Sequence, residues 1–204
     1  MEIALYIVDI REELPEEENI AQEIAPFYKE KYYSIKARQK ARQELYTGYL
    51  LRKYLGVKEE GDLSFGEDGK PYLTNGSCFF NVSHCKDMVA LAIADKEVGV
   101  DLERIRPYHR GTAQKVFLEE EVGYLESLEK GERDKEFIKL WTCCEAALKV
   151  GGTGFHNSWE KIRKIRSSVV TQTVSLEGSF VTIAANEEFI LKSCRNSSKE
   201  LLLR

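Results

Sequence analysis

The sequence predicts an α+β fold, and three observations support this. Short segments alternate apolar and polar residues, which is typical of strands with one buried face. Longer segments repeat apolar residues every three to four positions, which is typical of amphipathic helices. Both kinds of segment occur on each side of a break near residues 104–112. The 204-residue chain is 43% hydrophobic and 31% charged, so we expect a globular core in one large domain or two small ones.

The first part of the chain is predicted to form six strands and two helices. The strands are expected over residues 3–10, 63–65, 71–73, 78–82, 88–93 and 97–103. Residues 67–70 are predicted to form a hairpin turn. The helices are expected over 16–31 and 34–55, with Ser34 as the N-cap of the second and Gly56 just past its end.

The second part is predicted to form three helices followed by three strands. The helices are expected over 112–128, 133–150 and 158–165, and the glycines in 151–154 end the second of them. The strands are expected over 169–174, 180–184 and 189–193. No internal sequence repeat is evident, so the pattern alone predicts an α+β protein and leaves the number of subdomains open.

Charge and composition exclude several classes of protein. The net charge of −4 does not favour nucleic acid as a partner. No apolar run approaches the ~20 residues of a membrane-spanning helix, and the N-terminus lacks the features of a signal peptide, so we expect no membrane association and a cytoplasmic location. The five cysteines show no Cys-x-x-Cys spacing, and Cys143 is adjacent to Cys144, which indicates reduced thiols rather than a disulfide or a zinc site.

Two carboxylates lie at the end of an apolar strand. The alternation over residues 98–103 places Asp101 and Glu103 on one face and apolar side chains on the other. Neighbouring carboxylates repel unless a positive group joins them, and Mg2+ prefers such oxygen ligands. A solvated strand edge is the alternative explanation.

A third carboxylate and a lysine follow in the predicted helix 133–150. Glu145 and Lys149 are four residues apart and therefore share one helix face. A carboxylate beside a lysine is suited to binding a phosphate group that also contacts a metal ion. The two side chains also fit an ordinary surface ion pair, although the apolar residues nearby indicate that they lie at the boundary of the core.

Four short motifs, in this order, carry a family resemblance. They are Gly69-Lys70-Pro71, Phe80-Asn81-Val82-Ser83-His84, Gly99-Val100-Asp101-Leu102-Glu103 and Trp141-Thr142-Cys143-Cys144-Glu145-Ala146-Ala147-Leu148-Lys149. Each is weak alone, but together and in this order they resemble the 4′-phosphopantetheinyl transferases of the Sfp type, in the holo-acyl-carrier-protein synthase superfamily. The resemblance spans residues 69–149; it is loose over the first 60 residues and faint over the last 50.

The resemblance implies an activity. Such enzymes use Mg2+ to transfer the 4′-phosphopantetheine group of coenzyme A to a serine of an apo carrier protein, acyl or peptidyl, and release 3′,5′-adenosine bisphosphate. It also implies a fold: a pseudo-twofold pair of similar α+β subdomains with the active site in the cleft between them. We place the two halves at residues 1–104 and 105–204, and we expect a monomer from the length of the chain.

The resemblance also implies roles for individual residues. Asp101, Glu103 and Glu145 are the predicted metal ligands, and Asp101, Glu145 and Lys149 are the predicted catalytic residues, with Glu145 as a candidate general base. The coenzyme is predicted to contact Lys70, Ser83, His84 and Lys149, and more weakly Lys31 and Arg42 at its 3′-phosphate. A histidine after an apolar strand is otherwise commonly structural.

Two basic segments have alternative interpretations. Residues 29–53 hold Lys29, Lys31, Lys36, Arg38, Lys40, Arg42, Arg52 and Lys53, which form either a solvated helix face or a site for the 3′-phosphoadenosine group. Residues 104–118 combine basic side chains with Phe117 and Leu118, which either dock an acidic carrier protein or begin a helix packed in the core.

The sequence departs from the family pattern at Cys144, where relatives usually have lysine. A cysteine supplies no permanent positive charge. The alternative function is therefore a weakened or inactive relative that binds coenzyme A or a carrier protein. Another Mg2+-dependent phosphotransfer enzyme is a further alternative, but residues 151–154 lack the Lys-Ser/Thr of a phosphate-binding Gly-rich loop.

Overall fold

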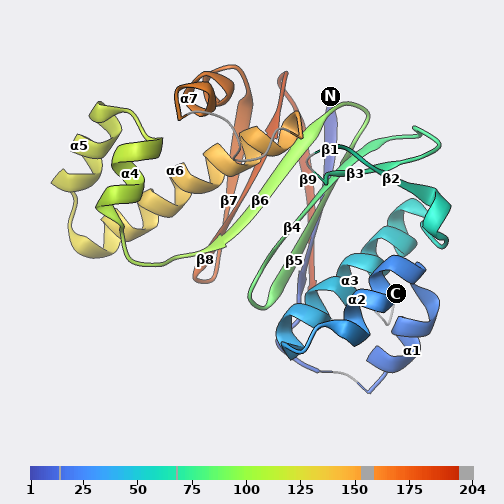
Figure 1. Ribbon diagram of the computed structural model, residues 1–204. Helices are drawn as coiled ribbons and strands as arrows, with labels where there is room; N and C mark the ends of the chain where they lie inside the picture. Colours follow the sequence, from blue (N-terminus) through green and yellow to red (C-terminus); the bar gives the residue numbers. More distant parts are fainter. Residues whose placement is uncertain (14, 68, 153–158, 198–204) are drawn as a thin grey trace.

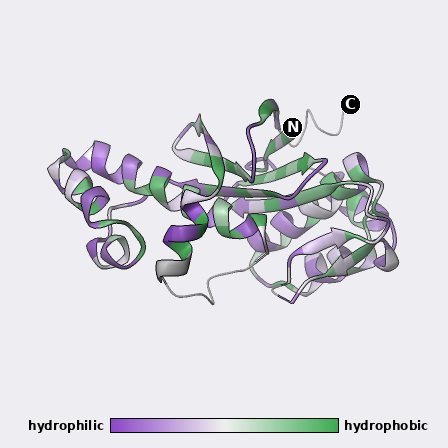
Figure 2. Cartoon of the chain, turned by 90° about the horizontal axis from the view of Figure 1, so that it is seen from above, coloured by the Kyte–Doolittle hydropathy of each residue, from purple (hydrophilic) through white to green (hydrophobic). Residues whose placement is uncertain are grey.

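The computed structural model describes residues 1–13, 15–67, 69–152 and 159–197 (Figure 1). Within these residues the helices and strands stack in layers. A group of helices covers one sheet, that sheet packs on a second sheet, and a long helix with shorter helices covers the far side. Figure 2 shows hydrophobic residues concentrated along the strands that lie between the two groups of helices. The fold is therefore mixed α+β, as the sequence predicts.

The first sheet joins segments from both ends of the chain. Its strand order is β4 (Phe79–Cys85), β5 (Met88–Ala94), β1 (Glu2–Asp9) and β9 (Ile190–Ser197). β1 runs antiparallel to β5 and parallel to β9. The short strands β2 (Leu63–Phe65) and β3 (Pro71–Leu73) form a separate hairpin after the 3-10 turn Glu60–Asp62.

Three helices cover one face of this sheet. They are α1 (Glu17–Glu23), α2 (Pro26–Ser34) and α3 (Arg38–Leu55). Leu45 and Leu50 of α3 pack with Val8 and Leu91 of the sheet in one buried cluster. Gly48 lets α2 and α3 approach closely, because a Cβ atom there would lie 2.8 Å from the Cβ of Tyr28.

The second sheet packs on the other face of the first. Its strand order is β6 (Val98–Arg104), β8 (Ser179–Ala185) and β7 (Val170–Leu176). Apolar side chains of both sheets form one cluster, in which Leu5 and Ile7 meet Val100 and Val181. The helix α6 (Lys130–Val150) covers β6 and β8, and α4 (Arg110–Val116), α5 (Glu119–Ser127) and α7 (Trp159–Ser167) surround its other sides.

All nine predicted strands are present, each within a few residues of its predicted bounds. The end of α3 is also confirmed, since Gly56 caps it in the left-handed conformation with φ of +72°. Asp68 of the predicted turn, residues 153–154 of the glycine stop and Ser158 lie outside the described residues.

Three helix predictions need correction. The predicted helix 16–31 is two helices, because Pro26 starts α2 and forces the preceding Ala25 into an extended conformation. Ser34 is the last residue of α2 and does not cap α3, whose N-cap is Ala37. The predicted helix 112–128 is interrupted where Phe117 and Leu118 adopt extended backbone conformations between α4 and α5.

No helix in the described part of the chain is both long and apolar enough to cross a membrane. All five cysteines are free thiols.

Candidate functional site

A glycine brings β6 and α6 into direct contact. A Cβ atom at Gly99 would lie 2.0 Å from the carbonyl oxygen of Ala146 and 2.8 Å from the amide nitrogen of Val150, so only glycine fits there. This close approach places Glu145 and Lys149 of α6 beside Asp101 and Glu103 of β6. The two motifs that the sequence singles out therefore meet at one site.

Asp101 lies at the centre of this site and is only 5% exposed. Its Oδ1 accepts hydrogen bonds from the Nζ of Lys149 at 2.7 Å and from the hydroxyl of Ser83 at 3.2 Å. Its Oδ2 is buried and has no hydrogen-bond partner among the described residues. A buried carboxylate oxygen without a donor is costly, so this atom is suited to a ligand.

The surroundings of Glu103 and Glu145 disfavour the ionised form of both side chains. Burial raises the pKa of Glu145 to about 7, and the charges of Asp101 and Glu103 add to the effect while Lys149 opposes it. Burial and the charge of Asp101 also raise the pKa of Glu103. Glu103 accepts a hydrogen bond from the indole of Trp141 at 3.2 Å and lies 4.0 Å from the guanidinium of Arg106. The three carboxylates thus form one region of negative charge.

The donor set fits a hard divalent cation. All three candidate ligands are carboxylates, their mutual repulsion is only partly offset by Lys149, and Asp101 Oδ2 is free. In the described part of the chain, however, no three His, Cys, Asp or Glu side chains are gathered closely enough to hold a metal ion as they stand. The ion pair of Lys149 is with Asp101 of β6, whereas the i, i+4 spacing suggested a pair with Glu145.

Ser83 connects β4 to this site. Its hydroxyl donates to Asp101 and accepts hydrogen bonds from the backbone N–H of Leu102 and from the Nζ of Lys149, both at 3.1 Å. A hydroxyl has one donor and two acceptor positions, so these contacts use all of them. Ser83 therefore organises the carboxylate site directly.

Lys31 and His84 lie at a separate pocket of about 390 Å³. The pocket is lined by Phe27, Tyr28, Lys31, Glu44, Thr47, Phe65, Gly69, Pro71, Val82 and His84. The Nζ of Lys31 lies 3.1 Å from Glu44 and 4.5 Å from the centre of the Phe27 ring. Loss of surrounding water lowers the pKa of His84, so its imidazole is neutral at pH 7. The pocket combines aromatic surface with one cation and one neutral donor.

Lys70 and Arg42 lie outside that pocket and have other partners. The Nζ of Lys70 is buried against Glu97 at 2.8 Å and the carbonyl of Val150 at 2.7 Å, and burial lowers its pKa. Arg42 is 5% exposed, pairs with Glu17 at 2.7 Å and donates to the carbonyls of Ile10 and Glu12. Their predicted contacts with coenzyme A remain predictions.

Several basic residues of the segment 29–53 form ion pairs with acidic residues of the protein. Besides Arg42, Arg38 pairs with Glu17 at 2.8 Å, and Arg52 lies 3.3 Å from Glu23. Arg38, Arg42 and Arg52 thus link α3 to acidic residues of α1, and Lys31 of α2 pairs with Glu44 of α3.

Cys144 faces away from the carboxylates. It is 1% exposed and packs with Leu148, Phe137 and Phe180 in the cluster beneath α6. Burial raises the pKa of its thiol to about 11, and Arg166 of α7 donates to its sulfur at 3.6 Å. A side chain at this position is directed into the core.

The segment 104–118 divides between the two interpretations. Phe117 is 1% exposed and belongs to the core, whereas Leu118 is 42% exposed. The basic side chains are partly paired, since Arg110 lies 2.7 Å from Glu126 and Arg104 lies 3.9 Å from Asp87.

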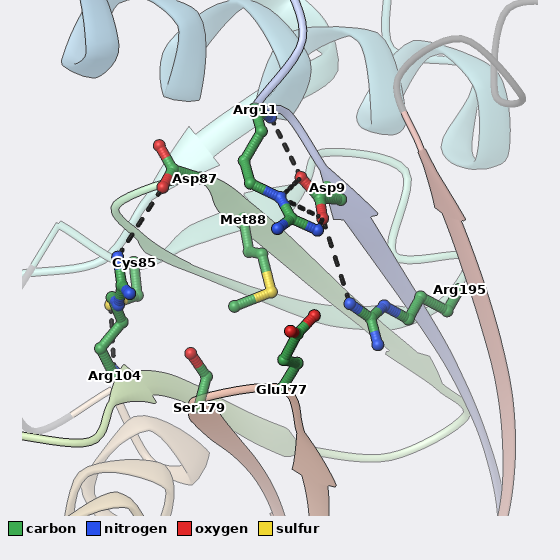
Figure 3. Close-up of a pocket in the computed structure, with 9 residues that line it drawn as sticks. All are labelled: Asp9, Arg11, Cys85, Asp87, Met88, Arg104, Glu177, Ser179 and Arg195. Carbon is green, nitrogen blue, oxygen red and sulfur yellow. Dashed lines mark hydrogen bonds and ion pairs between the residues drawn. The ribbon is translucent and has the colours of Figure 1, made fainter.

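Sequence reasoning did not identify a small pocket of about 80 Å³ at the ends of β1, β6 and β9 (Figure 3). Three arginines and three carboxylates line it together with Cys85, Met88 and Ser179: Arg11, Arg104, Arg195, Asp9, Asp87 and Glu177. Arg11 pairs closely with Asp9, and Arg195 lies 4.0 Å from the same carboxylate. These residues are scattered along the sequence, so no local motif indicates their meeting.

Sequence reasoning also missed Asn81 and Trp141 as neighbours of the carboxylates. The signal was present for Asn81, which is two residues from Ser83 and therefore on the same face of its strand. For Trp141 the signal was its position four residues before Glu145, which places both side chains on the same face of the helix.

Comparisons with known proteins cover the part of the chain that holds this site. Residues 97–194, which hold the carboxylates and Lys149, match the family described as the 4'-phosphopantetheinyl transferase superfamily. The chain is 36% identical over 114 residues to the 4'-phosphopantetheinyl transferase HetI of Nostoc sp., covering 52% of this chain and 48% of that protein. It is 27% identical over 158 residues to the 4'-phosphopantetheinyl transferase Sfp of Bacillus subtilis, covering 74% of this chain and 70% of that protein.

A third relative matches a stretch of similar length. The chain is 34% identical over 112 residues to the 4'-phosphopantetheinyl transferase gsp of Aneurinibacillus migulanus, covering 52% of this chain and 47% of that protein. The matched part thus spans about half the length of HetI and gsp. These matches show that the part of the chain that holds the carboxylates and Lys149 is similar in sequence to the 4′-phosphopantetheinyl transferase superfamily.

Proposed function

We propose that this protein transfers the 4′-phosphopantetheine group of coenzyme A to a serine hydroxyl of an apo carrier protein, with Mg2+ as cofactor. The observation that carries the proposal is the meeting of Asp101, Glu103, Glu145 and Lys149 at the contact of β6 with α6. The match of residues 97–194 to the 4'-phosphopantetheinyl transferase superfamily supports the same reaction.

Asp101, Glu103 and Glu145 would hold the magnesium ion. When bound, the ion neutralises charge on the pyrophosphate of coenzyme A and stabilises the charge that develops as the bond to the leaving group lengthens. The unpartnered Oδ2 of Asp101 supports this assignment, because it is a buried acceptor with no donor in the described chain.

Lys149 and Glu145 would act on the reacting groups. The Nζ of Lys149 offers positive charge to a phosphate oxygen, which preorganised cations stabilise in the transition state. A carboxylate with a pKa of about 7 suits proton transfer near neutral pH, so Glu145 is the candidate base for the carrier serine. The serine oxygen then bonds to the β-phosphorus, the bond to the 5′-phosphate of the nucleotide breaks, and 3′,5′-adenosine bisphosphate leaves.

The pocket of Lys31 and His84 would take the nucleotide end of coenzyme A. Phe27 and Phe65 offer aromatic surface for a base, and Lys31 offers a cation for the 3′-phosphate. Lys70 and Arg42 are left out of this assignment because they do not line this pocket and are buried against carboxylates and carbonyls.

The carrier protein would dock beside the segment 104–118. Arg106 and Arg110 are exposed there and Leu118 presents an apolar side chain, which suits an acidic partner with an apolar contact. The monomeric state and the cytoplasmic location remain predictions from the sequence.

A pseudo-twofold arrangement of the halves 1–104 and 105–204 is part of the proposal. It is supported by a reciprocal exchange of strands: the last strand of the first half, β6, pairs with β8, and the last strand of the second half, β9, pairs with β1. The carboxylate site then draws Asp101 from one half and Glu145 from the other.

The alternative of an inactive binding protein depended on Cys144. Because Cys144 faces the core beneath α6, its lack of charge does not count against transfer at the carboxylates. This position therefore gives no reason to prefer the alternative.

The proposal is tested by incubating the protein with coenzyme A, Mg2+ and a panel of apo carrier proteins and weighing the products. We expect at least one carrier to gain the mass of phosphopantetheine, and to gain none with Asp101→Asn or with a chelator present. Tight binding of coenzyme A without modification of any carrier would support the binding protein instead.

A further inference from the structure

The edge of β6 that faces β4 is held by side chains instead of a main-chain ladder. The two strands pack against each other but belong to different sheets. The backbone N–H of Val100 donates to Asn81 Oδ1 at 2.9 Å, that of Leu102 donates to Ser83 Oγ at 3.1 Å, and that of Arg104 donates to Cys85 Sγ at 3.2 Å. We call the three acceptor residues, Asn81, Ser83 and Cys85, the side-chain ladder. Its last contact is visible in Figure 3.

The ladder has a regular register. Both members of each pair advance by two residues, so one face of β4 meets alternate amides of β6. The intervening residues of β6, Asp101 and Glu103, pair with Thr182 and Phe180 of β8 on the other edge. The two carboxylates are thus fixed from both sides, by β8 on one edge and by the ladder on the other.

The ladder is buried where it flanks Asp101. Asn81 is 5% exposed and Ser83 is 6% exposed. Loss of one acceptor would leave an amide of β6 without a partner inside the protein, which costs about 1–3 kcal/mol. The strand would relieve that cost by shifting, and a shift of β6 moves both carboxylates relative to Glu145.

We propose that Asn81 and Cys85 are positioning residues that set the height and rotation of β6 so that Asp101 and Glu103 converge with Glu145 on a divalent cation. This rests on the proposed function only in assuming that these carboxylates bind a cation. Neither residue contacts the cation itself. Each acts through the backbone of β6.

The proposal is tested by titrating the purified protein with Mn2+ and following the free ion by its electron paramagnetic resonance signal, with thermal unfolding as a check on folding. Neither coenzyme nor carrier is needed. We expect Asn81→Ala to weaken Mn2+ binding about tenfold or more, as loss of residues behind metal ligands commonly does. We expect Cys85→Ala to act in the same direction and Cys85→Ser, which keeps an acceptor, to stay close to the original protein.

The matched control is Cys194→Ala. Cys194 is half-buried like Cys85 and accepts one hydrogen bond, from Asn196 at 3.2 Å, but it lies on β9 at the far edge of the first sheet. Its loss should leave Mn2+ binding unchanged. If Asn81→Ala fails to fold, the comparison of Cys85→Ala with Cys85→Ser decides.

Several results would overturn the proposal. They are unchanged Mn2+ binding in folded Asn81→Ala and Cys85→Ala, an equal loss in Cys194→Ala, or Mn2+ binding by the original protein that Asp101→Asn does not reduce. Ladder-dependent Mn2+ binding without transfer to any carrier would reject the proposed function and keep this inference, whereas transfer with ladder-independent binding would reject this inference alone.

Discussion

Gly99 of β6 lies so close to Ala146 of α6 that a Cβ atom would come within 2.0 Å of the Ala146 carbonyl oxygen. The helix supplies Glu145 on one side of that contact and Lys149 on the other. The spacing between strand and helix therefore sets the distance between the carboxylates of the two elements, and it depends on one missing side chain.

Gly99→Ala should damage both stability and activity. The added methyl group must push α6 away from β6, and overpacking of this kind typically costs about 1–3 kcal/mol. We also expect most of the transfer activity to be lost, measured by carrier mass at saturating coenzyme A. The control is Gly131→Ala in α6, where open space surrounds the glycine, and this change should be neutral or slightly stabilising. A well-folded and fully active Gly99→Ala would contradict this account of the contact.

Asp101→Asn and Glu145→Gln should each reduce transfer by about 100-fold or more while the fold remains intact. Each change keeps the shape of the side chain but removes a negative charge that the cation and the reacting phosphate require. The measurement is turnover as a function of Mg2+ concentration, with unfolding curves alongside. Near-normal turnover of either variant at limiting Mg2+ would remove that residue from the set of ligands.

Cation binding should strengthen as the pH rises from about 6 to 8. Burial raises the pKa of Glu145 to about 7, so the group is protonated below that pH and a cation must first displace the proton. Above that pH the carboxylate is ionised and available, so the affinity for the cation no longer changes with pH. We expect affinity for Mn2+ to rise by no more than about tenfold per pH unit over this range. Glu145→Gln should bind more weakly and lose the rise; a flat profile in the original protein would show that Glu145 does not take part.

Lys31→Ala and Arg42→Ala should have different effects. Lys31 lines the aromatic pocket, so its loss should reduce the preference for coenzyme A over 3′-dephospho-coenzyme A by about tenfold. Arg42 neutralises the buried Glu17, so its loss should destabilise the fold by about 3 kcal/mol, with Arg38 still pairing with Glu17.

Lys40→Ala is the control for both variants, because it removes an exposed positive charge from the same helix as Arg42. It should change neither the preference for coenzyme A over 3′-dephospho-coenzyme A nor the stability of the fold. Equal affinities of the original protein for the two coenzymes would remove the 3′-phosphate from this pocket, and a loss of preference in Arg42→Ala would restore the role that the sequence suggested.

Cys144→Lys should lower stability without raising turnover. The site is buried among Phe137, Leu148 and Phe180, and Arg166 lies beside it, so a second cation there lacks both water and a free partner. Cys144→Ala should be mild by comparison. The readouts are the melting temperature and carrier modification under identical conditions. A faster enzyme with lysine at this position would mean that the helix turns this residue toward the substrate.

The strands were predictable because each has a local signature. Alternation identified Asp101 and Glu103 as sharing a face, and the glycine after Leu55 marked the end of α3. The helix breaks were less evident. Pro26 is visible in the sequence, but the extended backbone at Phe117 serves to place that ring in the core, which no local pattern indicates.

The sequence identified the carboxylates and the lysine that meet at the contact of β6 with α6, but not which charged groups pair with one another. The partner of Lys149 is Asp101, 48 residues away, and the partners of Lys70 and Arg42 are Glu97 and Glu17. Each of these three cations is therefore paired with a carboxylate that lies far away in the sequence. The sequence shows which groups carry charge, whereas the packing of distant elements decides which of those charges remain available to a ligand.

The parallel pairing of β9 with β1 has a consequence for how the protein is made. The strand Glu2–Asp9 is synthesised well before its neighbour Ile190–Ser197, because most of the chain lies between them. Until then one edge of β1 exposes unpaired amides and carbonyls, which are prone to pair with other chains. The first sheet cannot close until Ile190–Ser197 has been synthesised, and chaperones that shield nascent chains have an exposed strand edge to cover until then.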